Sequence, residues 1–227
     1  MTKLVDLSHP IRDGMRTHPG IPEPRISTFL SHEASKERYA PGTTFEITRI
    51  DMVANTGTYL DTPAHRFPGA ADLSGLELSR VVDVDGVVAD CSAAGDDGGN
   101  RAIDGERLRE ALRGFDPRDR AVLVRTGWDR HWATEAYLSD NPFLTDDAAT
   151  WLVDAGAGLV GIDSLNVDSL TDPRRPAHTA ILGAGLPLVE HLAGLDQLPA
   201  SGFRFFAVPP RIEGMATFPV RAFAIFG

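Results

Sequence analysis

The chain has 227 residues, of which 42% are hydrophobic and 24% are charged, which is typical of a globular protein and argues against disorder. Its net charge of −10 repels phosphate backbones and anionic lipids, so we expect neither nucleic acid nor a membrane as a partner. The single cysteine, Cys91, excludes an intrachain disulfide and a zinc site of several thiolates. No basic, apolar leader begins the chain and no apolar run approaches the roughly 20 residues of a bilayer span, so we expect a cytoplasmic protein.

Seven short runs, each bounded by turn residues, predict β-strands. In chain order they are 3–7, 45–53, 81–90, 121–125, 159–163, 203–208 and 220–226. The runs 121–125 and 159–163 are almost wholly apolar, which is typical of strands covered on both faces. The run 45–53 instead alternates with a break in phase, which predicts a half-exposed or bulged strand.

Helices are predicted only after residue 103. Asp104 can cap a helix that extends towards residue 115, and Thr145 can cap a second one with two acids in its first turn. A third, short helix is predicted over 188–192, and the Asp- and Gly-rich segment 96–100 predicts a surface loop. Together these elements predict the α/β class: a single domain around a mixed sheet with flanking helices.

The segment 55–65 carries an unusual density of polar residues. Asn55 and Gly57 follow a predicted strand, and Asp61 and His65 flank Pro63, which stiffens the backbone. A rigid loop that presents polar side chains at a strand end is where α/β folds commonly place function. The alternative is a structured turn in which Asp61 caps backbone amides and His65 is merely exposed.

A second cluster contains His178, which precedes an apolar segment punctuated by glycines, and then Glu190 and His191. Taken alone, Glu190 is interpreted as a solvated acid of the predicted short helix and His191 as a surface residue. Cys91 is interpreted as a buried, unreactive thiol.

Taken together, these residues resemble the cyclase family, which contains bacterial kynurenine formamidases and isatin hydrolases. Its signature, His-x-Gly-Thr-His-x-Asp-x-Pro-x-His, is matched at the right spacing by Gly57, Thr58, Asp61, Pro63 and His65. Further ordered similarities cover nearly the whole chain, at 6–10, 15–20, 161–164, 178, 190, 209–214 and 219–222. The resemblance implies one cyclase-like domain over 1–227, a partly barrel-like sheet, and a homodimer or homotetramer.

The resemblance also implies roles for individual residues. Asp61, His178 and Glu190 would hold one divalent ion, zinc or manganese, which two carboxylates and an imidazole can bind with positions left open. His65 would move a proton during catalysis, because an imidazole titrates near neutral pH.

Two signature histidines of the family are replaced here by Asn55 and Tyr59. An amide oxygen is a poor zinc ligand and a phenol must lose its proton to bind well, so we expect the second metal site of the family to be lost. Tyr59 is then predicted to be a catalytic group that donates a hydrogen bond to an oxyanion. Asn55 and His18 are predicted to bind substrate, and His18 replaces a tryptophan that is frequent in the family.

The expected function is therefore a metal-dependent hydrolase of a small amide, formamide, lactam or ester, similar to the arylformamidases of tryptophan catabolism. One alternative is a metal-free lyase, cyclase or isomerase, with Asp61 and His65 as the base and Tyr59 as the acid. The other is a non-catalytic homologue that binds a small molecule, because a fold does not determine a function.

Overall fold

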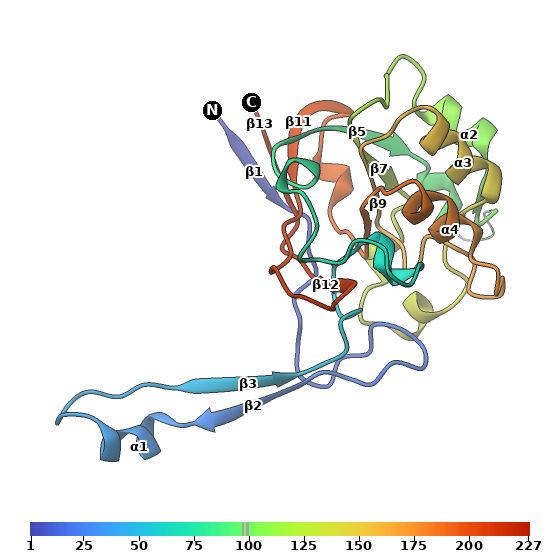
Figure 1. Ribbon diagram of the computed structural model, residues 1–227. Coiled ribbons are helices and arrows are strands. Elements are labelled where there is room, and N and C mark those ends of the chain that lie inside the picture. Colours follow the sequence, from blue (N-terminus) through green and yellow to red (C-terminus); the bar gives the residue numbers. More distant parts are fainter. Residues whose placement is uncertain (97, 99) are drawn as a thin grey trace.

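A nine-stranded mixed sheet that curls into a half barrel forms the centre of the computed structural model (Figure 1). The model describes residues 1–96, 98 and 100–227, so the loop predicted over 96–100 falls partly outside the described residues. In order across the sheet, the strands are β1 (Lys3–Asp6), β13 (Phe223–Phe226), β11 (Ser201–Phe206), β5 (Val84–Asp90), β7 (Ala121–Arg125), β9 (Leu159–Ile162), β10 (Leu188–Glu190), β4 (Tyr59–Asp61) and β12 (Thr217–Pro219). The first and last strands of the chain are neighbours, so one sheet unites both ends of the sequence.

The middle of the sheet is parallel and its edges are antiparallel. Strands β5, β7, β9 and β10 pair in parallel, and three helices cover one face of this part (Figure 1). The helices are α2 (Gly105–Ala111), α3 (Asp146–Asp154) and α4 (Pro176–Gly183). The side chain of Asp104 accepts a hydrogen bond from the Arg107 N–H at 2.8 Å, which confirms the predicted cap of α2.

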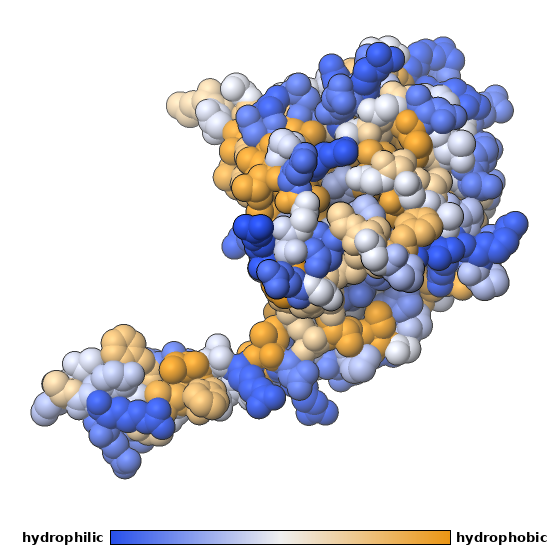
Figure 2. All heavy atoms as spheres, viewed as in Figure 1, coloured by the Kyte–Doolittle hydropathy of each residue, from blue (hydrophilic) through white to orange (hydrophobic). Residues whose placement is uncertain are grey.

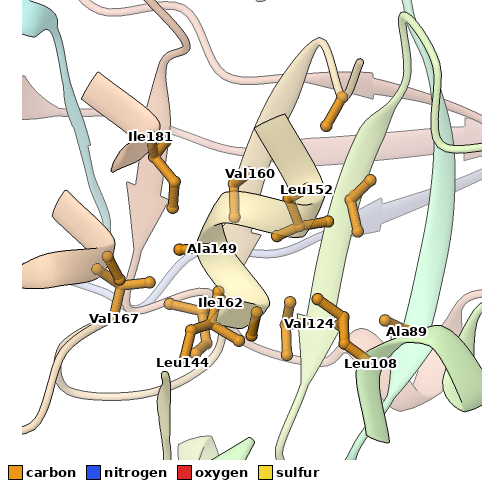
Figure 3. Packing of buried hydrophobic residues seen from close by; sticks show 14 of the residues in the cluster. Ala89, Leu108, Val124, Leu144, Ala149, Leu152, Val160, Ile162, Val167 and Ile181 are labelled. Carbon is orange, nitrogen blue, oxygen red and sulfur yellow. The ribbon is translucent and has the colours of Figure 1, made fainter. Parts of the chain in front are cut away.

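The alternation of side chains along the parallel strands creates two hydrophobic cores. One set packs against the helices: Val87, Ala89, Val122, Val124, Val160 and Ile162. Ala89, Val124, Val160 and Ile162 are labelled in Figure 3. The intervening residues pack on the opposite face, inside the curl of the sheet, with Leu60, Phe203 and Phe205. The prediction that 121–125 and 159–163 are covered on both faces is confirmed. Cys91 is buried, as predicted.

Residues 25–51 form a projection that we call the arm. Strand β2 (Arg25–Leu30) pairs with β3 (Ile47–Asp51) in a ribbon separate from the main sheet, and α1 (His32–Ser35) lies near its far end (Figure 1). The strand predicted over 45–53 is confirmed, but it is not half buried, because all five residues of β3 are exposed. The register irregularity lies on its partner, between Thr28 and Leu30.

One local prediction is wrong, and one helix has no counterpart among the predictions. The segment 188–192 begins as strand β10, not as a helix, because its backbone pairs with β9 and β4. The helix α4 was not predicted, since its mixture of small and apolar residues has no clear polar face. A short parallel pair, β6 (Ala102–Ile103) with β8 (Phe143–Leu144), completes the strands of the described residues. None of the described helices has the length and apolar character needed to cross a bilayer.

Candidate active site

One group of polar residues of the site lies on strands at the antiparallel edge of the sheet. Strand β4 lies between β10 and β12, so that Tyr59 is opposite Glu190 and Asp61 is opposite Thr217. Residues directly opposite one another in a sheet project to the same face. Leu60 projects to the other face and is buried in the hydrophobic core. One face of this edge therefore carries several polar residues although they are buried.

Asp61 is the most enclosed of these groups, with a side chain that is 0% exposed. Its Oδ1 accepts a hydrogen bond from the Thr217 hydroxyl, and its Oδ2 has no hydrogen-bond partner among the described residues. Burial raises the pKa of Asp61 to about 6, with nearby His65 and His178 acting against the rise. An unpartnered carboxylate oxygen at this depth is costly, so it indicates that a cation or polar ligand belongs beside it.

His65 ends a short 3₁₀ turn, Pro63–His65, that follows β4 directly. Its Nδ1 lies 3.7 Å from Asp61 Oδ1 and 3.1 Å from the Thr217 hydroxyl oxygen. Because that hydroxyl donates its proton to Asp61, it accepts from His65, which assigns the ring proton to Nδ1. The Nε2 lone pair of His65 is then free to accept a proton.

His178 reaches the same place from helix α4. Asp168 accepts hydrogen bonds from the backbone N–H groups of Ala177 and His178, at 2.7 and 3.1 Å, and from His178 Nδ1 at 2.7 Å. The carboxylate thus caps the helix and orients the imidazole, as partners of metal-binding histidines commonly do. Burial acts to lower the pKa of His178, but Glu190 and Asp168 outweigh it and raise the value to about 9.

Glu190 lies close both to Tyr59 of strand β4 and to His178 of helix α4. Its Oε1 lies 3.8 Å from His178 Nε2, which in turn lies 3.9 Å from Asp61 Oδ2. The Tyr59 hydroxyl donates to Glu190 Oε2 at 2.5 Å, and the Val167 N–H donates to Oε1 at 2.6 Å. Glu190 is therefore a buried strand residue that faces Tyr59 and His178, and its interpretation as a solvated helix acid is wrong.

Tyr59 remains a protonated phenol in this environment. Burial, together with the nearby carboxylates of Glu190 and Asp61, raises the pKa of Tyr59 well above its usual value. A phenolate ligand is thereby disfavoured, and the hydroxyl acts as a hydrogen-bond donor. In this structure that donor is directed to Glu190.

A cavity of about 360 Å³ opens over these groups. Six of the seven predicted site residues line it: His18, Asn55, Tyr59, His65, His178 and Glu190. Asp61, the seventh, lies close to His65 and His178 but is wholly buried. The fold therefore brings together residues that are separated by as many as 172 positions in the chain, from His18 to Glu190.

The donor set fits a metal ion. Among the described residues, Asp61, His65 and His178 each offer a ligand atom, and these atoms lie within 4.8 Å of one another. This tightest group contains His65 in place of the predicted ligand Glu190. The free Oδ2 of Asp61 and the oriented Nε2 of His178 belong to both possible sets.

Sequence reasoning missed several residues of the site. Asp168 and Thr217 orient His178 and Asp61, and Asn166, Arg66 and Arg175 line the cavity. Asp168 lies eight positions before Pro176, the first residue of α4, so no local capping pattern reveals it. Only the tertiary structure identifies these neighbours.

One further residue differs from its sequence interpretation, and the structure gives Asp163 a structural role. His191 is not a surface residue: it is 0% exposed, and its Nδ1 lies 3.0 Å from the Tyr137 hydroxyl. Asp163, in the segment 161–164 that resembles the family, instead accepts hydrogen bonds from the backbone of Thr126 and Gly127. It holds the turn after β7.

Comparisons with known proteins agree with the family resemblance of the sequence. A family model described as a putative cyclase matches residues 5–169. A kynurenine formamidase of Bacillus cereus is 28% identical over 227 residues, which cover 97% of this chain and 96% of the relative. A kynurenine formamidase of Polaromonas naphthalenivorans is 26% identical, with 97% and 89% covered.

Solved structures resemble the whole chain. Isatin hydrolase A from Ralstonia solanacearum superposes with a TM-score of 0.84 at 25% identity, and covers 100% of this chain and 92% of its own. Isatin hydrolase A from Labrenzia aggregata, bound to benzyl benzoate, gives 0.83 at 25% identity, with 99% and 94% covered. The single α/β domain with a barrel-like sheet, predicted from the sequence, is confirmed.

Proposed function

This chain belongs to the cyclase family, and on that premise we propose that it is a metal-dependent hydrolase that cleaves a small amide, formamide, lactam or ester. The observation that best supports this proposal is the cluster of Asp61, His65 and His178 beside a cavity of about 360 Å³. The similarity to kynurenine formamidases and isatin hydrolases supports hydrolysis of a C–N bond. N-formylkynurenine is the first substrate to test, and its hydrolysis would link the protein to tryptophan catabolism.

We propose that Asp61, His178 and Glu190 hold one divalent ion, zinc or manganese. Such an ion, when bound, polarises a carbonyl and makes water more acidic. Asp61 supplies its unpartnered Oδ2, and Asp168 keeps the Nε2 of His178 directed at the site. With Asn55 and Tyr59 in the family's histidine positions, we propose a single ion per chain.

The proton is carried by His65. Its Nδ1 is held by Thr217, so its Nε2 takes the proton of the attacking water and returns it to the leaving nitrogen or oxygen. Tyr59 stays protonated and is proposed to donate to the developing oxyanion, which requires its hydroxyl to exchange Glu190 for the substrate. Asn55 and His18 line the cavity and are proposed to contact substrate.

The experiment is a comparison of His65→Ala with the exposed His32→Ala as a matched control. Loss of a general base lowers the turnover number on N-formylkynurenine by about 10²–10⁴-fold, while His32→Ala stays at the parental rate. Metal content of each purified variant is measured alongside. If His65→Ala loses the metal and Glu190→Gln keeps it, His65 is a ligand and another group carries the proton.

A metal-free lyase, cyclase or isomerase is the second candidate, and the raised pKa of His178 favours it. Asp61 and His65 would be its base and Tyr59 its acid, while a protonated His178 would balance the buried carboxylates. Activity that survives a chelator in protein without bound metal would support this candidate. Binding of a small molecule without any turnover would instead support a non-catalytic homologue.

We further propose that the protein is cytoplasmic and works as a homodimer or homotetramer, with a small molecule as its substrate. The acidic net charge of −10 supports the absence of nucleic acid and anionic membranes among its partners.

A further inference from the structure

Two arginines line the cavity without an acidic partner. Arg66 and Arg175 both contribute to its wall, and neither forms an ion pair with any of the described residues. Arg174, immediately next to Arg175, instead pairs with Asp172 at 2.7 Å and does not line the cavity. Both arginines therefore bring positive charge to a cavity that Glu190 also lines.

The two arginines are held in place by the same network. The Nε of Arg66 donates to the Thr179 hydroxyl at 3.1 Å, and that hydroxyl donates to the Arg175 carbonyl at 2.7 Å. The Nη1 of Arg175 donates to the Ser169 carbonyl at 3.0 Å. Because each guanidinium has five N–H donors, both retain donors that these contacts do not use.

Asn166 adds a neutral donor to the same wall. Its side-chain oxygen accepts from the Asp168 N–H at 3.0 Å and lies 3.4 Å from Arg175 Nη1. This fixes the amide with its NH₂ group free to donate to a ligand, and Asn166 lines the cavity. Three side chains that line the cavity, Arg66, Arg175 and Asn166, therefore retain hydrogen-bond donors.

The two arginines are neighbours, in the chain, of residues that are proposed to act on the substrate. Arg66 directly follows His65, and Arg175 directly precedes α4, the helix that carries His178. The planar fork of a guanidinium matches a carboxylate or phosphate. A dianion would be repelled more strongly than a monoanion by Glu190, which lines the cavity, and by Asp61 beside it.

We propose that the substrate carries a carboxylate, which Arg66, Arg175 and Asn166 bind beside the bond to be cleaved. The inference rests on the proposed hydrolase function for the identity of that bond. The anion subsite itself does not depend on that function. It gives this protein a preference for an acidic aryl formamide over its neutral counterpart.

Turnover is tested with N-formylanthranilate and its methyl ester, which share the ring and the formamide and differ by one charge. Charge-assisted hydrogen bonds favour the acid in kcat/KM by about 10–100-fold in the parent protein. Arg175→Gln and Arg66→Gln each reduce that preference, mainly through KM, and the double variant abolishes it. Arg174→Gln removes the same charge one position away and leaves the preference unchanged.

Binding is tested separately, so that failure of the hydrolase proposal does not obscure the result. Calorimetry with anthranilate and the neutral anthranilamide gives a preference for the anion in the parent and none in the double variant, even if neither formamide is hydrolysed. Arg175→Lys, which keeps the charge but not the fork, retains part of the preference and controls for disturbed folding.

Three results would overturn the proposal. The first is equal affinity of the parent for anthranilate and anthranilamide. The second is an equal loss of anthranilate binding in Arg174→Gln. That result would show that binding depends on the overall charge of the protein and not on the two arginines of the cavity. The third is tighter binding of phenyl phosphate than of benzoate, which would assign the wall to a phosphate group instead.

Discussion

The body of the molecule and its arm treat polar and apolar groups in opposite ways. In the body, buried acids such as Asp61, Asp163 and Asp168 are held by hydrogen bonds from neighbouring elements. In the arm, large hydrophobic or aromatic residues are exposed to solvent: Ile26, Phe29, Tyr39, Phe45, Ile47 and Ile50. Figure 2 shows hydrophobic residues on the surface of the arm. The body thus has the interactions that define one conformation, whereas the arm has a surface without a covering layer.

This difference between the body and the arm indicates which of the two can be stable on its own. A two-stranded ribbon is at best marginally stable in water, because it lacks a hydrophobic face packed against another layer. The nine-stranded sheet of the body has both faces covered along β7 and β9. Substitutions should therefore act on folding in the body and on association in the arm.

The largest effect on stability is expected from Asp168→Ala. It leaves the two backbone N–H groups at the start of α4 and the ring of His178 without their acceptor. Removing one member of a buried pair costs roughly 3–5 kcal/mol, which urea denaturation measures directly. Asp168→Asn keeps one acceptor oxygen and should cost less. A loss below about 1 kcal/mol would mean that the Asp168 contacts are not what stabilises the body.

A smaller effect is expected from Gly161→Ala in strand β9. A Cβ there would lie 2.7 Å from the side chains of both Leu123 and Leu192. Overpacking of this kind costs about 1–3 kcal/mol, again measured as the free energy of unfolding in urea. Gly75→Ala is the control, because its Cβ would meet its nearest neighbour at 3.7 Å. Equal stability of the two variants would show that the sheet has space to adjust.

The smallest effect on unfolding is expected from Phe29→Ser with Ile50→Ser in the arm. These side chains are 69% and 48% exposed, so their loss should change the free energy of unfolding of a monomer by less than about 0.5 kcal/mol. If a second copy of the chain covers the arm, the variant dissociates to monomers at concentrations where the parent stays associated. Sedimentation equilibrium measures this directly.

Leu78→Ser is the matched control for the arm, since Leu78 is 63% exposed on the body. A monomeric parent would contradict the predicted homodimer or homotetramer. An associated parent whose arm variant also remains associated would assign the interface to another surface.

The sequence by itself determined the elements whose pattern is local. The strands over 121–125 and 159–163 follow from the apolar runs 122–124 and 159–162, and the start of α2 follows from Asp104. The resemblance to the cyclase family also singled out Asp61, His178 and Glu190, which the fold brings together. In these cases a short stretch of chain carries enough information, either in its period or in its motif.

Only the tertiary structure decided the elements and contacts that depend on distant neighbours. The segment with Glu190 becomes a strand because β4 and β9 pair with it, against its local preference. His191 is buried by Tyr137, and His178 is oriented by Asp168, although neither partner is adjacent in the chain. The arm shows the converse, because its sequence alternates like a half-buried strand while no layer of its own chain covers it. Burial is a property of the assembled sheet, so the chain alone specifies which residues are apolar but not which of them find a partner.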